Sequence, residues 1–167
     1  VRLAPNMNLS AQNPSMRAFN IRGVGTNDSF GNAAGSIGVY LDEVTLSAPY
    51  LTGLTMFDVE RVEVLRGPQN ALFGRNATGG AVKLVSRAPV SGDRDGQLAL
   101  TLGDHGAVDL TGAASFDVTD RTAVRIAARG FERDGNFRNL SDGSDYGAID
   151  RKSARLTLAS NLEAVSI

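Results

Sequence analysis

Side chains capable of catalytic or metal chemistry are few in this sequence, and none of them has the spacing of a known site. His105 is the only histidine, and it lies in a turn between Gly103 and Gly106, where a solvated residue is expected rather than a general base. The absence of cysteine excludes disulfide scaffolds, thiolate zinc sites and cysteine nucleophiles. We therefore expect no enzymatic activity, no metal site and no cofactor.

Nucleotide, nucleic-acid and calcium sites also lack support. Residues 67–74, followed by Arg75, begin and end with glycine, but the G-x-x-x-x-G-K-[ST] spacing and the lysine of a phosphate loop are missing. The formal net charge of −1 gives no case for a basic, nucleic-acid-binding face. The aspartates of the second half lack the D-x-D-x-D-G spacing of a calcium loop. They are Asp117, Asp120, Asp142, Asp145 and Asp150.

The most regular succession of local signals lies near the middle of the chain. Residues 60–65 alternate between valines and charged side chains, which predicts a half-buried strand. Gly67 and Pro68 end this strand, because proline has no N–H to donate to a ladder. One helical turn is predicted at residues 69–73. A second strand is predicted at residues 81–86, after a glycine pair that permits a tight turn.

The segments before this stretch predict short elements separated by loops. A hairpin with Asp42 and Glu43 at its tip is expected within residues 38–46. Residues 55–58 predict one helical turn with Thr55 as its N-terminal cap. The other expected segments are a lead-in at 1–15, a strand at 16–22, and loops at 24–37 and 47–54. Together these elements make a small mixed α/β domain over residues 1–90.

Beyond residue 90 the pattern changes to longer alternating segments with one apolar and one polar face. They lie at residues 97–103, 108–118, 121–133 and 152–163. A short turn at Thr119-Asp120 and a long polar loop at 134–150 separate the later ones. The alternation is typical of a transmembrane β-barrel, and also of a soluble antiparallel meander that buries its apolar face. In the soluble case the chain would bury Leu98, Leu100, Leu102, Leu156 and Leu158.

The sequence resembles the plug-domain signature of TonB-dependent outer-membrane receptors in three blocks, which follow one another in the order of that family. They are IRG (residues 21–23), VYLDEV (residues 39–44) and residues 60–89. The resemblance is strong over residues 17–89 and weak afterwards. One departure is Glu43, where glycine often follows the aspartate in the family. The implied fold is an α+β plug domain of mixed short strands and helical turns in residues 1–90. Antiparallel strands of an incomplete transmembrane β-barrel would follow in residues 91–167.

The resemblance also implies a function. TonB-dependent receptors take up scarce nutrients across the outer membrane of Gram-negative bacteria, and a ferric siderophore is the default substrate. TonB, with ExbB and ExbD, would act through a segment that we expect to be missing from this chain. Four strands cannot close a barrel in lipid, so we expect the chain to be part of a longer receptor. The alternative from another class is a soluble binding or signalling module with a plug-like fold.

The resemblance assigns two groups of site residues. Ligand contacts are expected from the outward-facing plug loops. They are Arg22, Asn27, Asp28, Phe30, Tyr50 and Leu51. Charged side chains on the plug flank are expected to pair with charged side chains of the barrel wall. They are Arg61, Glu63, Arg66 and Arg75 on the plug, with Arg125 and Arg129 on the wall.

Overall fold

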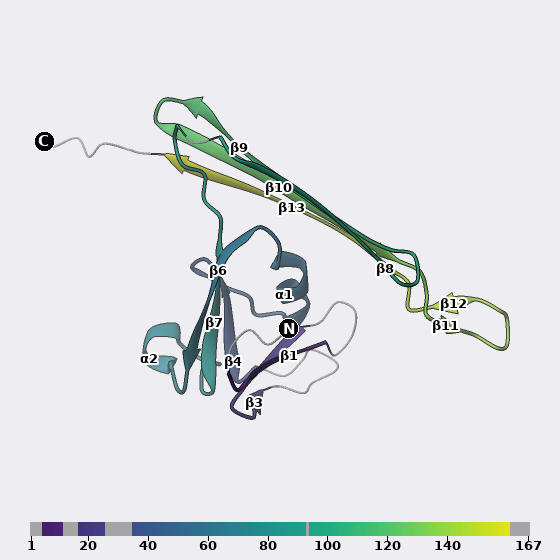
Figure 1. Ribbon diagram of the computed structural model, residues 1–167. Coiled ribbons are helices and arrows are strands. Elements are labelled where there is room, and N and C mark those ends of the chain that lie inside the picture. The colour runs from purple at the N-terminus through teal and green to yellow at the C-terminus, as the bar shows by residue number, and fades with distance from the viewer. Residues whose placement is uncertain (1–4, 12–16, 26–34, 93, 161–167) are drawn as a thin grey trace, which may run out of the picture. The chain divides into compact units, whose positions relative to one another are not determined.

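The computed structural model describes residues 5–11, 17–25, 35–92 and 94–160, and Figure 1 shows the elements that they form. The chain divides into two compact units, Val1–Ser86 (unit 1) and Arg87–Ile167 (unit 2). Among the described residues most elements are β-strands and two are short helices. Neither helix is long and apolar enough to cross a membrane.

The first sheet of unit 1 contains three antiparallel strands in the order β1-β2-β3. They are β1 (Met7–Ala11), β2 (Arg17–Ile21) and β3 (Val24–Gly25). The strand predicted at 16–22 is therefore confirmed, but the lead-in predicted for 1–15 is wrong at β1. Met7 pairs with Ile21 across the two strands, and both side chains are buried. This pairing makes β1 a strand, although its own sequence pattern is weak.

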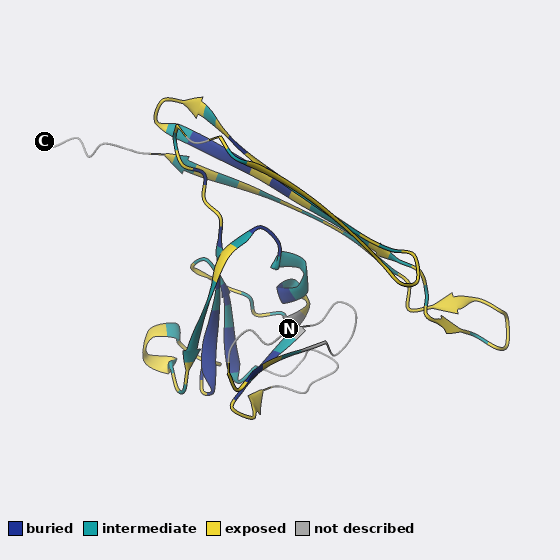
Figure 2. Cartoon of the chain, viewed as in Figure 1, coloured by how far each residue is buried: buried dark blue, intermediate teal, exposed yellow. Residues whose placement is uncertain are grey.

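The second sheet of unit 1 has the order β5-β4-β7-β6. Its strands are β4 (Ile37–Leu41), β5 (Val44–Thr45), β6 (Val59–Arg66) and β7 (Gly80–Ser86). β7 lies inside the sheet, parallel to β4 and antiparallel to β6. Most of its residues are buried (Figure 2). The hairpin predicted within residues 38–46 and the strands predicted at residues 60–65 and 81–86 are confirmed.

The hydrophobic core of unit 1 lies between these two sheets. The first sheet and the second sheet each contribute buried apolar side chains. They are Met7, Phe19 and Ile21 from the first sheet, with Ile37, Val82 and Leu84 from the second. Val62 and Val64 of β6 pack against this cluster. The alternation of valines and charged residues that predicts this strand therefore also predicts which of its faces is turned to the core.

The helix α1 (Pro49–Thr55) corrects the sequence prediction, which places a loop at 47–54 and a helical turn at 55–58. Pro49 is compatible with a helix here because it occupies the first turn, where its missing N–H is not needed. Thr52 is only 1% exposed, so one side of the helix is buried. Thr55 ends the helix, and its hydroxyl donates back to the Leu51 carbonyl at 2.9 Å. It is therefore not an N-terminal cap.

The helix α2 (Asn70–Phe73) confirms the single helical turn predicted between the two strands. Tyr40 of β4 holds it in place, because its hydroxyl donates to the Phe73 carbonyl at 2.6 Å. The two aromatic rings are also in contact, with centroids 5.0 Å apart. Leu72 on this helix is 83% exposed.

Unit 2 contains a four-stranded antiparallel sheet in the order β13-β10-β9-β8. Its strands are β8 (Gly96–Gly103), β9 (Ala107–Thr119), β10 (Thr122–Arg133) and β13 (Ile149–Ser160). The four predicted strands are confirmed, with the short turn one residue later, at Asp120 and Arg121. The long loop contains a small hairpin of β11 (Phe137–Arg138) and β12 (Asp145–Tyr146).

The two faces of this sheet differ sharply. On one face the register aligns apolar side chains from all four strands, such as Leu100 with Leu110 and Ile126 with Leu156. The five leucines named above are 62–79% exposed. The opposite face carries Ser115 and Arg125, which are 6% and 1% exposed, and the fully buried Ala123. Unit 2 therefore presents its apolar face outward and not to a core of its own.

Candidate functional site

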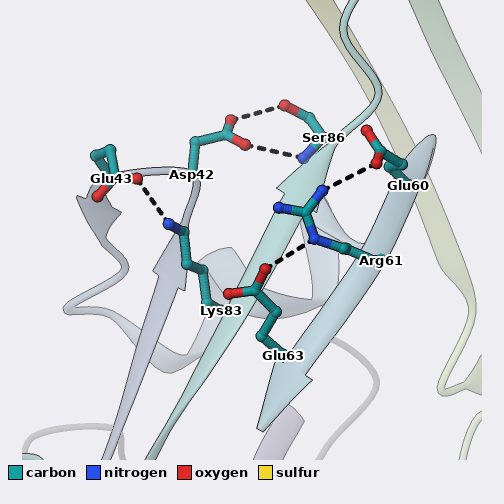
Figure 3. Close-up of polar contacts among 7 residues, drawn as sticks. All are labelled: Asp42, Glu43, Glu60, Arg61, Glu63, Lys83 and Ser86. Atoms are coloured by element: carbon teal, nitrogen blue, oxygen red, sulfur yellow. Dashed lines mark hydrogen bonds and ion pairs between the residues drawn. The ribbon is translucent and has the colours of Figure 1, made fainter. Parts of the chain in front are cut away.

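A strip of charged side chains lies on the face of the second sheet that points away from the core of unit 1. Because Val62 and Leu84 face the core, their neighbours Glu63 and Lys83 face the other way, directly opposite each other. A bulge between Val59 and Arg61 brings Glu60 beside the same face. We call these residues the charged strip, and Figure 3 shows it. They are Glu43, Glu60, Arg61, Glu63 and Lys83.

The charged strip is held by three ion pairs. Arg61 donates to Glu60 at 2.9 Å and to Glu63 at 2.8 Å, and Lys83 donates to Glu43 at 2.6 Å. The hydrogen bond that Arg61 donates to Glu63 raises the pKa of Arg61, and the bond that Lys83 donates to Glu43 raises the pKa of Lys83. The side chains of Arg61, Glu60 and Glu63 are 40–53% exposed, so these pairs contribute little to folding stability, whereas Lys83 is only 22% exposed. With three carboxylates and two cations, the strip offers charges of both signs to a partner.

Asp42 lies at the tip of the β4–β5 hairpin and forms hydrogen bonds with Ser86, the last residue of unit 1. It adopts a positive φ of 54°, and its N–H donates to the Leu84 carbonyl at 2.8 Å. Its carboxylate accepts from the Ser86 N–H at 2.8 Å and from the Ser86 hydroxyl at 2.7 Å (Figure 3). Glu43 does not prevent this turn, because Asp42 alone carries the positive φ. The sequence predicts the turn but gives no signal for the bond to Ser86.

The structure separates the plug-flank residues into two groups. Arg61 and Glu63 lie together in the charged strip. Arg66 ends β6 and Arg75 follows α2, and both are exposed. Arg66 and Arg75 are therefore not part of the strip, and their pairing with a barrel wall stays a prediction.

Both predicted wall arginines bind aspartates within unit 2. The buried Arg125 guanidinium donates to the Asp95 carboxylate at 2.9 Å and to the Ser115 hydroxyl at 2.8 Å. Arg129 binds Asp109 in bidentate fashion, with its Nε 2.9 Å from one carboxylate oxygen. Hydrogen bonding from Ser115, together with the charge of Arg125, lowers the pKa of Asp95.

These contacts anchor the segment that enters the sheet of unit 2. Asp95 directly precedes β8, and its bond to Arg125 fixes this point to β10. Three residues earlier, the Gly92 N–H donates to the Asp117 carboxylate at 3.0 Å. The start of unit 2 is therefore attached to the polar face of its own sheet at two places.

The predicted ligand contacts are only partly described, and the described ones do not form one cluster. Asn27, Asp28 and Phe30 lie outside the described residues. Arg22 is exposed in the turn after β2, and the neighbouring Ile21 and Val24 lie close to Gly80 and Gly79 at the start of β7.

The other two predicted contacts lie on α1. Tyr50 is 52% exposed and Leu51 is partly buried. Residues 56–58 lead from this helix to Val59, which pairs with Ser86 at the end of β7. Arg22 and α1 are therefore associated with different ends of β7, and the ligand site stays a prediction.

Replacing Asp42 by glycine tests the joint to Ser86. Glycine accepts the positive φ, so the substitution removes the carboxylate without adding backbone strain. We expect the loss of two hydrogen bonds to lower local stability by about 1–3 kcal/mol. Native-state hydrogen exchange of the β7 amides would measure it. Glu43→Ala is the control, because it removes only an exposed ion pair next to the Asp42–Ser86 bonds and should change this exchange little. Equal effects of both variants would contradict the proposed role of these bonds.

Comparison with known proteins adds independent evidence about this chain. Residues 1–81 match the protein-family model described as TonB-dependent Receptor Plug Domain. The pesticin receptor of Yersinia pestis is 37% identical over 95 residues, which cover 56% of this chain and 14% of the receptor. The ferrioxamine B receptor of Salmonella typhimurium is 31% identical over 112 residues, which cover 65% of this chain and 15% of the receptor.

The fold has a solved counterpart in both units. The crystal structure of the ferric yersiniabactin uptake receptor FyuA from Yersinia pestis matches with a TM-score of 0.81 and 26% identity. The match covers 94% of this chain and 25% of that receptor. The chain thus spans about a seventh of the length of the curated relatives. On the family match and the relatives, the first 81 residues are a plug domain of the TonB-dependent receptor family, and the fold of the whole chain resembles the matching part of FyuA.

Proposed function

We propose that this chain is the plug domain and part of the barrel wall of an outer-membrane receptor for energy-coupled uptake of a ferric siderophore. The observation that carries the proposal is the exposed apolar face of the unit 2 sheet, in the same chain as a TonB-dependent receptor plug domain. Such a face is costly in water and favourable in lipid.

The dimensions of the sheet support a membrane location. Its four strands contain 8, 13, 12 and 12 residues. A tilted strand needs about 9–11 residues to cross the hydrocarbon core of a bilayer. The polar face, with its buried Arg125 and its Arg129–Asp109 pair, has the character of a barrel lumen. A closed barrel would also pair the outer edges of β8 and β13 with further strands.

The soluble alternative requires that the leucines of unit 2 be buried in a core of the chain itself. Leu98, the most exposed of them, has 79% of its surface accessible, and the least exposed has 62%. This exposure favours the membrane receptor over a soluble binding or signalling module.

The plug domain suggests how the receptor binds its ligand and its partners. In this proposal the loops around Arg22, Asn27, Asp28 and Phe30 contact the ligand from the plug, with Tyr50 and Leu51 of α1 as further contacts. The name of FyuA refers to uptake of a ferric siderophore complex, which supports the same substrate class here. TonB, energised through ExbB and ExbD, would supply the force that opens the plug.

The charged strip suggests where the plug meets the wall. Its exposed carboxylates and cations, with Arg66 and Arg75 nearby in sequence, could pair with charges across a wet interface. On the wall side we assign Arg125 and Arg129 to this interface. Each would interact with the plug while it keeps its aspartate partner in unit 2.

Cell fractionation tests the location of the receptor. An antibody against residues 60–87 should recover a species from outer membranes that is several times heavier than the 17.5 kDa of this chain. Intact mass spectrometry would measure it. A 17.5 kDa species in the aqueous fraction would contradict the proposal.

Leu100→Arg tests whether the apolar face meets lipid. Arginine at the middle of a lipid-facing strand costs about 2–4 kcal/mol, so less folded receptor should reach the outer membrane. Thr101→Arg, one residue further on the polar face of β8, should be tolerated, because that face would line the lumen. Heat-modifiable mobility on gels would report the folded barrel, and equal losses for both variants would argue against a lipid-facing sheet.

Charge reversal at Arg66 tests the interface between plug and wall. We expect Arg66→Glu to increase hydrogen exchange across the plug domain of the full-length receptor, because an attractive pair becomes a repulsive one. Arg138→Glu, an exposed position in the β11–β12 hairpin, serves as the control. Unchanged plug protection in Arg66→Glu would remove this residue from the interface.

A further inference from the structure

The segment that enters the sheet of unit 2 has one firm attachment, at Asp95. Its carbonyl accepts from the Ser115 N–H at 2.8 Å, next to the first paired residues of β8 and β9. Its carboxylate accepts from Arg125 at 2.9 and 3.1 Å. Because the Arg125 side chain is only 1% exposed, detaching Asp95 would separate a buried charge from its carboxylate partner, which is costly. We call this attachment the anchor.

Two weaker polar contacts hold residues 87–94, which precede the anchor. The Gly92 N–H donates to the Asp117 carboxylate at 3.0 Å, in a position open to solvent. The Arg87 guanidinium lies 3.7 Å from the Asp95 carboxylate, and these two side chains are 44% and 39% exposed. Exposed polar contacts add little to stability, because water competes for the same groups. Both contacts can therefore open while the anchor stays in place.

The backbone of residues 87–94 is folded so that these contacts can form. Gly92 has a positive φ of 85° in a turn at residues 91 and 92, a conformation that glycine adopts without strain. Of the described residues in the segment, Pro89 is buried and the others are exposed or partly exposed, including Val90 at 63%. Burial therefore involves one described residue, and the turn with its two polar contacts determines the closed arrangement.

We propose that the hydrogen bond of Gly92 and the ion pair of Arg87 form a releasable latch on this segment. When the latch is closed, the first backbone attachment of the segment is Gly92. When the latch is open, the first backbone attachment is the anchor, three residue steps further along the chain, and the reach of the segment grows by about 10 Å. The latch consists of contacts within unit 2, so it goes beyond the proposed uptake function and needs no ligand.

Double electron–electron resonance tests the latch in the full-length receptor in detergent, with the other cysteines of the receptor replaced by serine. This chain has no cysteine, so spin labels are placed by Val90→Cys and Asp120→Cys at exposed positions. Asp117→Ala removes one contact of the latch, and Arg87→Gln added to it removes both. We expect the double variant to broaden the distance distribution toward separations up to about 10 Å longer. A second label pair, Ala99→Cys with Asp120→Cys, should keep its distance, because β8 stays anchored.

Asp145→Ala is the matched control, because it removes an exposed aspartate of β12 and should leave the distances of the first label pair unchanged. Broadening in the double variant alone would show that either contact keeps the latch closed. An unchanged distribution in the double variant, or an equally broad one in the receptor with the latch residues intact, would overturn the latch. A change in the second label pair would overturn the anchor as the fixed end. None of these results bears on the uptake proposal, which depends on the location and lipid-facing sheet of the receptor.

Discussion

The alternation of side chains along the strands of unit 2 is the constraint on which the functional interpretation depends, because it gives every strand two chemically different faces. Burying one leucine side chain is worth roughly 1.5–3 kcal/mol, and many apolar side chains share the outward face. No single layer of strands can cover both of its own faces. A non-aqueous surrounding therefore favours the exposed face. On the polar face, arginines and aspartates form ion pairs such as Arg125–Asp95 and Arg129–Asp109.

In unit 1 the strand β7 has the corresponding central role. Its inward residues Val82 and Leu84 complete the core, while Lys83 belongs to the charged strip on the other face. Its end is fixed by the two bonds from Ser86 to Asp42. A single strand thus connects the core, the surface charges and the exit of the chain from the plug domain.

Local pattern predicted much of this fold but little of its long-range bonding. The strand–helix–strand stretch around α2 and the four strands of unit 2 follow from periodicity and turn residues, which act over a few positions. β1 is defined by its pairing with β2, and α1 contains Pro49, which favours a loop unless it lies in the first turn. Asp42 and Ser86 are 44 residues apart in sequence, so no local pattern could reveal their bonds.

The anchoring of the chain on both sides of the boundary between the units has a mechanical consequence. Ser86 is bound to Asp42 in unit 1, and Gly92 is bound to Asp117 in unit 2. Only residues 87–91 lie between these attachments, and the six residue steps from Ser86 to Gly92 can extend to at most about 20–22 Å. While both attachments persist, this segment is a short linker with a fixed maximum length. The two attachment points can therefore separate only by the length of this segment, whatever rearrangement occurs within either unit.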